Sequence, residues 1–377
     1  MAQWQEKLIP LKTLTTGDVL HLHLFSITGS RPGPSIYLQS SMHASEIQGQ
    51  GVLYHLLKYL KQHDFAGQIQ VMALANPLAA QQQVLTHTLG RYNFLTGNNW
   101  NRNYLDLKDH LHFDFAAFAH QYLTAPKAQI VPAFKQAYLK ALQDFLKNPY
   151  GIRDEQKLAV ILQSYASQAD IVIDLHNAWA GTHYLYATQD DATAQAWGIP
   201  YIIRMPYQFA GALDEASFMP WYHLAQAFAA EGTPLKFDFN SYTVELGSEA
   251  NFSFAQSGQD LMLLLNYLAA RGVVTFTPHL SSPIYESDLA NFKTYYAPRT
   301  GLIDFLAAPG EMVTAQKVMA QYLTWPQITA PEIADFVGRP ETVLALSDGV
   351  ILNHANANQV QEGQELIQVL EKLRPIK

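Results

Sequence analysis

The chain has 377 residues, of which 49% are hydrophobic and 15% charged, a composition that excludes a disordered chain and suits one large domain plus a smaller one. No apolar run reaches the roughly 18 residues of a membrane span, and Met1–Leu14 lacks the cationic start and apolar stretch of a secretion signal. We therefore expect a cytoplasmic protein with no membrane partner.

Charge and cysteine usage narrow the function classes further. A formal net charge of -8 leaves no basic face for a phosphate backbone, so we expect no nucleic-acid partner. The chain has no cysteine, which excludes a cysteine nucleophile, thiolate metal ligands and iron–sulfur clusters. Any transition-metal site must therefore use imidazole and carboxylate, and the 14 histidines permit one.

Strand-like and helix-like segments alternate over the first two-thirds of the chain, which predicts an α/β domain with a mixed, largely parallel sheet flanked by helices. In such sheets, ligands bind beyond the carboxyl ends of the strands. In chain order, the pattern predicts strands at Val19–Ile27 and Pro34–Gln39, a helix at Ile47–Leu60, a strand at Ile69–Ala75, a helical region over 131–168 broken at 148–151, strands at Ile171–Leu175 and His183–Ala187, a helix at Phe218–Ala230, a strand at Tyr242–Leu246 and a helix at Gln259–Arg271.

The sequence pattern changes near residue 273, where helix-forming residues become scarce and glycine turns separate short β-like segments. A weak internal repeat, Thr300–Val313 and Asp348–Gln364, resembles the two halves of a lipoyl- or biotinyl-type barrel-sandwich. A carrier domain needs a lysine at the hairpin between its halves, and none occurs from Val318 to Glu371. We therefore expect an α/β domain over 1–272, a linker over 273–289 and a structural, all-β C-terminal domain over 290–377.

A candidate metal site follows two of the predicted strands. His43 and Glu46 lie three residues apart between a strand and a helix, so one turn can direct imidazole and carboxylate to one point. His176 ends another strand, in the motif Asp174-Leu175-His176-Asn177, and can meet the first pair from there. Two histidines and one glutamate suit Zn²⁺, leaving the fourth tetrahedral position for water. A satisfied polar histidine is the alternative for any one of them alone.

Glu245 is a candidate general base. It lies late in an otherwise apolar strand, and burying a carboxylate without partners costs several kcal/mol. Activation of a water at a metal would explain its position, because partial desolvation raises a carboxyl pKa towards the working range. A strand-end carboxylate at the solvent edge is the competing interpretation.

Arginines between the ligands suit a substrate carboxylate. Asn101-Arg102 combines a planar guanidinium with amide donors, which favours bidentate capture of a carboxylate, and a second arginine can face the oxyanion of acyl transfer. An ordinary polar loop with Arg102 paired at the surface is the alternative. Arg204, on a strand, is a candidate for a second carboxylate and equally for a structural role.

The order His43-x-x-Glu46, Asn101-Arg102, Asp174-x-His176, Glu245-x-Gly247 resembles the succinylglutamate desuccinylase and aspartoacylase family, within the zinc carboxypeptidase superfamily. The resemblance implies that His43, Glu46 and His176 hold one zinc ion per chain and that Glu245 acts as base, then acid. It also implies that Asn101 and Arg102 grip a carboxylate and that Arg91 stabilises an oxyanion. The C-terminal segment is similar to the domain that those deacylases carry.

Three functions remain open at this stage. The first is zinc-dependent hydrolysis of an amide, removing the acyl group from an N-acyl amino acid or a related small amide that bears a carboxylate. The second is a metallocarboxypeptidase, in which Arg102 grips the terminal carboxylate of a short peptide. The third is a catalytically silent binding protein of the same fold. The sequence leaves the acyl group, the amino acid and any homo-oligomer undetermined.

Overall fold

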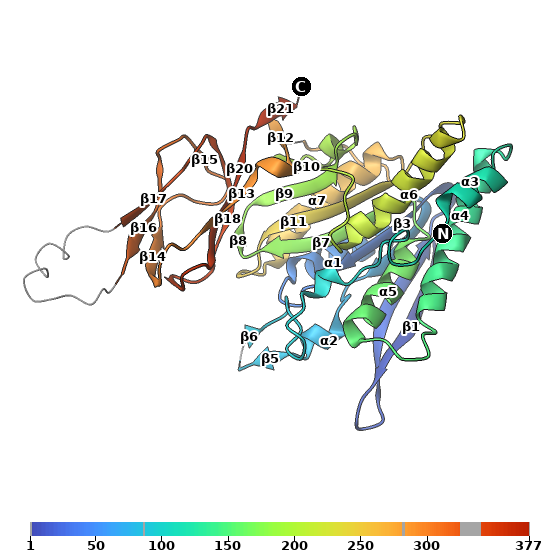
Figure 1. The fold of residues 1–377 in the computed structure, drawn as a ribbon, viewed down its shortest axis with the longest axis horizontal. Helices are drawn as coiled ribbons and strands as arrows, with labels where there is room; N and C mark the ends of the chain where they lie inside the picture. The colour runs from blue at the N-terminus through green and yellow to red at the C-terminus, as the bar shows by residue number, and fades with distance from the viewer. Residues whose placement is uncertain (1, 86, 281–282, 325–340, 377) are drawn as a thin grey trace, which may run out of the picture.

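The structure is a computed structural model that describes residues 2–85, 87–280, 283–324 and 341–376. A single large sheet runs through it, with a smaller β-domain at one end (Figure 1). Among the described residues, no helix combines the length and apolar character that crossing a membrane requires.

Ten strands form the large sheet, and its central strands β4, β3, β7 and β11 run parallel. This confirms the predicted mixed, largely parallel sheet. In spatial order the strands are β1 (Gln3–Thr13), β2 (Val19–Thr28), β4 (Ala66–Met72), β3 (Arg31–Ser40), β7 (Ile171–Ala178), β11 (Asn240–Ser248), β9 (His183–Thr188), β10 (Tyr201–Met205), β12 (Ile284–Asp288) and β21 (Arg374–Ile376).

Helices cover both faces of the sheet because its strands are apolar on both sides. Ile171 and Ile173 of β7 pack in one core cluster with α1 (Gln48–Leu60) and α7 (Phe254–Ala270), whereas Val172 packs in another with α5 (Asp154–Ala166) and α6 (Leu213–Ala230). Successive side chains of a strand point to opposite faces, so one strand serves both cores. Further helices are α2 (Pro77–Ala80), α3 (Phe115–Gln121), α4 (Lys127–Phe145) and the 3₁₀ turns η1 (Trp100–Arg102), η2 (Ala194–Trp197) and η3 (Leu289–Asn291).

Some elements differ from the sequence-based expectation. The helical region over 131–168 divides into α4 and α5 on either side of the expected break. Strand β1 was not predicted, because its alternation is weak and most of its side chains are exposed; it forms a long antiparallel hairpin with β2. Helix α6 begins five residues earlier than expected and carries Pro220 in its interior, where proline usually marks a boundary.

The C-terminal region is a sandwich of two antiparallel sheets, which confirms the predicted all-β region. Its core combines Ile303 and Met319 from one sheet with Ile351 and Val369 from the other. One sheet comprises β13 (Phe292–Tyr296), β20 (Glu365–Glu371), β18 (Gly349–His354) and β15 (Met312–Val313), and the other β17 (Glu341–Leu344), β16 (Val318–Leu323), β14 (Gly301–Phe305) and β19 (Gln359–Val360). Residues 325–340, between the two halves of the weak repeat where a carrier domain would hold its lysine, lie outside the described residues.

Backbone hydrogen bonds join the sandwich to the large sheet. The short strand β8 (Ala180–Gly181), which follows β7, pairs with β18 of the sandwich. The expected linker 273–289 contains β12, which pairs with β10, and the chain returns at its end so that β21 pairs with β12. We keep 1–272 and 290–377 as proposed domain limits, and β8, β12 and β21 form the hydrogen-bonded connection between the two regions. A small hairpin of β5 (Gln83–Val84) and β6 (His87–Thr88) completes the described elements.

Candidate metal centre and its pocket

The loop after β3 turns sharply and brings two candidate ligands together. Ser41 has a φ of 56°, a left-handed conformation that is uncommon for a residue with a side chain. Its hydroxyl donates to the backbone oxygen of Glu46 over 2.9 Å, and the amide of Glu46 donates to the backbone oxygen of His43 over 3.0 Å. The turn therefore directs the side chains of His43 and Glu46 to the same side.

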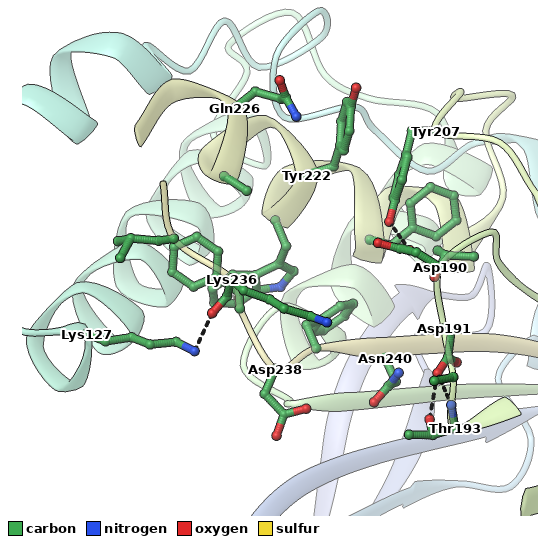
Figure 2. Close-up of a pocket in the computed structure, with 18 of the residues that line it drawn as sticks. Lys127, Asp190, Asp191, Thr193, Tyr207, Tyr222, Gln226, Lys236, Asp238 and Asn240 are labelled. Carbon is green, nitrogen blue, oxygen red and sulfur yellow. Dashed lines mark hydrogen bonds between the residues drawn. The ribbon is translucent and has the colours of Figure 1, made fainter. Parts of the chain in front are cut away.

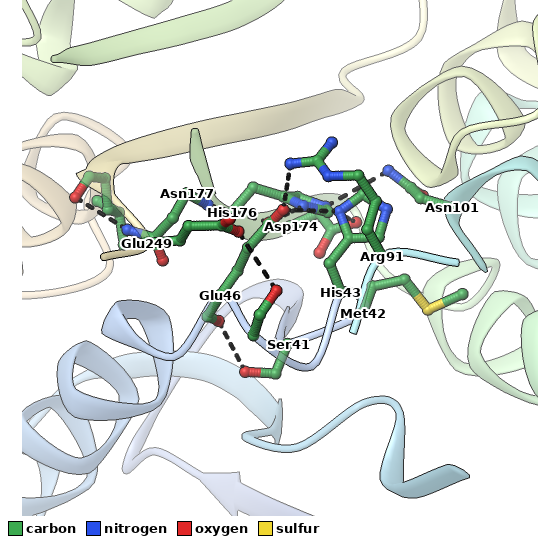
Figure 3. A network of polar contacts seen from close by, with 12 residues as sticks. Ser41, Met42, His43, Glu46, Arg91, Asn101, Asp174, His176, Asn177 and Glu249 are labelled. Carbon is green, nitrogen blue, oxygen red and sulfur yellow. Dashed lines mark hydrogen bonds and ion pairs between the residues drawn. The ribbon is translucent and has the colours of Figure 1, made fainter. Parts of the chain in front are cut away.

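His176 completes the cluster from the end of β7. The Glu46 carboxylate lies between the two imidazoles, 2.8 Å from His43 Nδ1 and 2.7 Å from His176 Nδ1 (Figure 3). Ligand atoms of the three residues all lie within 4.8 Å of one another, and each side chain is buried. The structure thus brings together the three residues that the sequence singled out, in an arrangement that can hold a metal ion.

The far ring nitrogens of the histidines are held by neighbouring polar groups. His43 Nε2 lies 2.9 Å from Asn99 Oδ1, and His176 Nε2 lies 3.0 Å from Asp174 Oδ2. Such contacts fix the ring orientation and leave Nδ1 as the ligand atom, as second partners of metal-binding histidines do. Asn99 was missed in the sequence, because nothing in its local pattern distinguishes it from its neighbours in an asparagine-rich loop.

Arg91 reaches the cluster through a close approach of two loops. The amide of Ala44 donates to the backbone oxygen of Gly90 over 3.2 Å, and a Cβ at Gly90 would lie 2.3 Å from the amide nitrogen of Ser45, so only glycine fits. The guanidinium that follows donates from Nη2 to Glu46 Oε1 over 2.6 Å. Its Nε has no hydrogen-bond partner among the described residues.

Glu245 faces the cluster from β11. It is in register with His176 on the adjacent parallel strand, and its Oε2 is buried with no hydrogen-bond partner in the described part of the chain. Burial, followed by repulsion from Glu46, raises the pKa of Glu245 to about 7. A carboxylate of this kind can accept and return a proton near neutral pH.

The charges of the cluster fit a metal cation. Burial alone would raise the pKa of Glu46, but His43, Arg91 and His176 hold it well below its usual range, so the carboxylate is ionised. Burial lowers the pKa of His43 and so favours the neutral imidazole that a metal requires. Burial alone would lower the pKa of His176, but Asp174 and Glu46 raise it well above its usual value, so without a metal this imidazole carries a positive charge. A divalent cation bound by the cluster would replace that proton beside the same carboxylates.

The cluster opens into a pocket of about 450 Å³ on the face of the sheet that α6 covers. Strand alternation places Thr243 and Glu245 on this face, opposite the core residues Tyr242 and Val244. The sandwich closes the far wall, where the amide of Asn353 donates to Gln368 Oε1 over 2.5 Å. The C-terminal region therefore contributes side chains to the pocket, which the sequence did not predict.

Two of the three expected substrate-binding residues line this pocket. Asn101 lies 3.4 Å from His176 Nε2 through its amide nitrogen, and Arg102 lies next to it. Arg204 lies outside: its Nε donates to Glu286 of β12 over 2.7 Å, and its Nη1 donates to the backbone oxygen of Asp191 over 2.8 Å. The geometry thus favours the structural alternative for Arg204, and it is not retained as a substrate ligand.

A larger hollow of about 810 Å³ lies elsewhere along α6 (Figure 2). Tyr207 and Tyr222 stack at one side of it, with ring centroids 4.1 Å apart, and Lys127 contacts the backbone of Lys236 at the other. No histidine is found among the described residues that line it. Because it lacks the His–Glu–His cluster, we place the chemistry in the smaller pocket.

Asp214, which the sequence did not single out, lies in the wall of the metal pocket at the start of α6. Its side chain is buried, and burial followed by repulsion from Glu215 raises the pKa of Asp214 from 3.8 to about 6. A carboxyl whose folded pKa exceeds its unfolded one favours folding below the unfolded pKa, and this contribution is lost as the pH rises through the folded pKa. Ionised Asp214 therefore destabilises the fold above pH 6.

We expect Asp214→Asn to raise the free energy of unfolding at pH 8 by up to about 3 kcal/mol, the equivalent of a shift of about two pKa units. The gain should fall by roughly half at pH 5, where the wild-type carboxyl is largely protonated in the folded state. Urea titration of both proteins at the two pH values is the measurement, with exposed Asp304→Asn as control. An equal gain at both pH values, or a loss at pH 8, would contradict the prediction.

Comparison with known proteins identifies the family and supports the fold. Residues 32–271 match the model of the succinylglutamate desuccinylase/aspartoacylase catalytic domain. A protein of that family from Shewanella amazonensis SB2B has a solved structure that is 31% identical, with a TM-score of 0.91 over 99% of this chain and 100% of that one. Another from Shewanella frigidimarina NCIMB 400 is 30% identical, with a TM-score of 0.92 over 100% and 99% of the two chains.

More distant structures share the fold. The product-bound ectoine utilization protein from Ruegeria pomeroyi is 15% identical, with a TM-score of 0.64 over 100% of this chain and 95% of that one. No curated protein matches the chain. The matched model covers more than half of the sequence, and the two Shewanella structures align along nearly the whole of it. The family predicted from the ordered motifs is therefore confirmed, and the chain belongs to the succinylglutamate desuccinylase/aspartoacylase family.

Proposed function

We propose that this protein is a zinc-dependent hydrolase that removes the acyl group from an N-acyl amino acid. The observation that carries the proposal is the position of Glu245, which lies in register with His176 and close enough to Glu46 and Arg91 for their charges to shift its pKa. Its buried Oε2 has no hydrogen-bond partner among the described residues. Family membership supports a hydrolase, and the His–Glu–His cluster supports a metal. A cluster of imidazole and carboxylate ligands with an adjacent glutamate base suits zinc hydrolysis.

The residues of the chain divide the reaction between them. His43, Glu46 and His176 would hold the zinc ion, which supplies Lewis-acid polarisation of the carbonyl and lowers the pKa of a water. Glu245 takes the proton from the attacking water and delivers it to the leaving nitrogen. Arg91, whose Nε has no hydrogen-bond partner among the described residues, would stabilise the oxyanion.

Recognition of the substrate falls to the loop that carries Asn101 and Arg102. The guanidinium of Arg102 forms no ion pair among the described residues and lines the pocket, so it is available to a carboxylate of the substrate. A planar guanidinium binds a carboxylate through two parallel hydrogen bonds, and an adjacent amide adds a donor. This arrangement supports a small amide that carries a carboxylate.

The size of the pocket favours deacylation over the carboxypeptidase alternative. The volume is about 450 Å³, and the side chains of Asn353, Glu365 and Gln368 from the sandwich close its far wall. A pocket of this size accommodates a molecule of metabolite dimensions, which supports a small amide as the substrate. The chain retains all three candidate ligands and the candidate base, which supports an enzyme over a silent binding protein.

Purified protein should bind one zinc ion per chain, and His43→Ala and His176→Ala should each reduce zinc content to a small fraction of wild type. Each removes one of three protein ligands from a buried site. Metal analysis after dialysis is the measurement, and His279→Ala, a histidine outside the cluster, is the matched control. Retention of zinc by both cluster variants would rule out this site.

Glu46→Gln and Glu245→Gln should separate the ligand from the base. Glu46→Gln should weaken zinc binding together with activity, because the carboxylate is a ligand. Glu245→Gln should retain near-normal zinc and lose turnover by about 10²–10⁴, since glutamine cannot accept a proton. Substrate affinity should change little, because Asn101 and Arg102 provide the grip on the carboxylate.

Zinc content, ligand affinity and turnover of both variants, assayed beside a panel of N-acyl amino acids and a panel of peptides, are the measurements. Loss of zinc from Glu245→Gln with retention by Glu46→Gln would reverse the two roles. Normal turnover by Glu245→Gln would overturn the mechanism, and faster hydrolysis of peptides than of N-acyl amino acids would favour the carboxypeptidase.

A further inference from the structure

The metal pocket contains a buried carboxylate that the proposed reaction does not use. Asp214 lies at the N-terminal end of α6, is only 4% exposed and lines the pocket. Its Oδ1 accepts a hydrogen bond of 2.9 Å from the amide of Glu215, and Thr243 also hydrogen-bonds to it. Both of these partners are electrically neutral.

Among the described residues, Asp214 takes part in no ion pair. Four of the seven other buried carboxyl groups do contact a histidine or an arginine: Glu46, Glu155, Asp174 and Asp260. A buried carboxylate without a cationic partner is costly, so a ligand that supplies the cation would gain a strong, charge-assisted hydrogen bond. Glu215 differs, because its carboxylate accepts hydrogen bonds from the amides of Ala210 and Ala212.

The lining of the pocket beyond the metal cluster is negative. Asp214, Glu215 and Glu365 contribute three carboxyl groups, against the single guanidinium of Arg102, among the residues that the structure describes. Away from the metal cluster and Arg91, a second carboxylate on the substrate would find no further guanidinium among the described lining residues and would face these carboxyl groups. A substrate with one carboxylate and one cationic group would complement both the positive and the negative side chains of the lining.

The two recognition residues line the same pocket. The loop before Asp214 packs on the backbone of Arg102, since a Cβ at Gly211 would lie 3.0 Å from the backbone oxygen of Arg102. The charges of Asp214 and Arg102 both act on the hydroxyl of Tyr186, which also lines the pocket. One small molecule in the pocket could therefore reach both residues.

We propose that the pocket selects N-acyl derivatives of basic amino acids, with Arg102 binding the α-carboxylate and Asp214 binding the cationic end of the side chain. This inference rests on the proposed function, which identifies the acyl group as the part of the substrate that reacts. It names a specificity-determining residue, Asp214, and a substrate class that family membership does not supply.

Binding measured without turnover tests the inference separately from the reaction. We would titrate the zinc-loaded Glu245→Gln variant with three ligands in a calorimeter at pH 7.5. They are N-acetyl-lysine acetylated on the α-nitrogen, its uncharged counterpart N-acetylnorleucine, and the acidic N-acetylglutamate. We expect N-acetyl-lysine to bind at least tenfold more tightly than N-acetylnorleucine, and N-acetylglutamate to bind most weakly. Adding Asp214→Asn should reduce the preference for lysine over norleucine to less than about threefold while the affinity for N-acetylnorleucine stays within threefold.

Controls keep the outcomes separate. Asp304→Asn, an exposed change on the sandwich, should preserve the preference, and circular dichroism verifies that each variant is folded. Equal affinity for the lysine and norleucine derivatives, tightest binding of N-acetylglutamate, or a preference that persists in Asp214→Asn would each overturn the inference. Hydrolysis by the wild-type enzyme is scored separately: absence of turnover on every N-acyl amino acid tests the proposed function, whereas the ratio of binding affinities alone decides the role of Asp214.

Discussion

The buried carboxylate of Glu46 is the constraint on which the site depends. At 1% exposure it has no access to water, so the protein must satisfy both of its oxygens. His43 and Arg91 contact Oε1, while His176 and the amide of Asn177 contact Oε2. Segments that are far apart in the chain are therefore held at one point, and the same convergence forms the proposed metal cluster.

The parallel strands make this convergence possible. The ends of β3, β7 and β11 lie at one edge of the sheet, because adjacent parallel strands finish on the same side. Alternation along each strand then sends apolar residues such as Ile173 into the α1–α7 core and polar residues such as Asp174 towards the pocket. One backbone arrangement thus supplies both the stability of the core and the position of the reactive groups.

The sandwich is part of the same construction. It is hydrogen-bonded to β8, which directly follows β7. Glu249 links it to the loop that carries His43 and Glu46, because its carboxylate lies 3.3 Å from the hydroxyl of Ser45 and 3.2 Å from the amide of Asn356. The sandwich also provides a wall of the pocket, through Asn353, Glu365 and Gln368. Functional carboxylates in that pocket work against stability, since the uncompensated charge of Asp214 costs free energy that the large core must offset.

The sequence by itself determined the α/β class, the family and the candidate residues that the structure brings together at one cluster. Three features can be read from the sequence without a structure. They are the spacing of His43 and Glu46, the strand ends at His176 and Glu245, and the order of these residues along the chain. Only the tertiary structure decided which other side chains enter the pocket. Asn99, Asp214 and Asn353 meet the site through loop packing, a helix start and a second domain, and no local pattern encodes contacts between segments so distant in sequence. Arg204 lies outside the pocket for the same reason: its partner Glu286 is 82 residues away on a strand that the sequence did not predict.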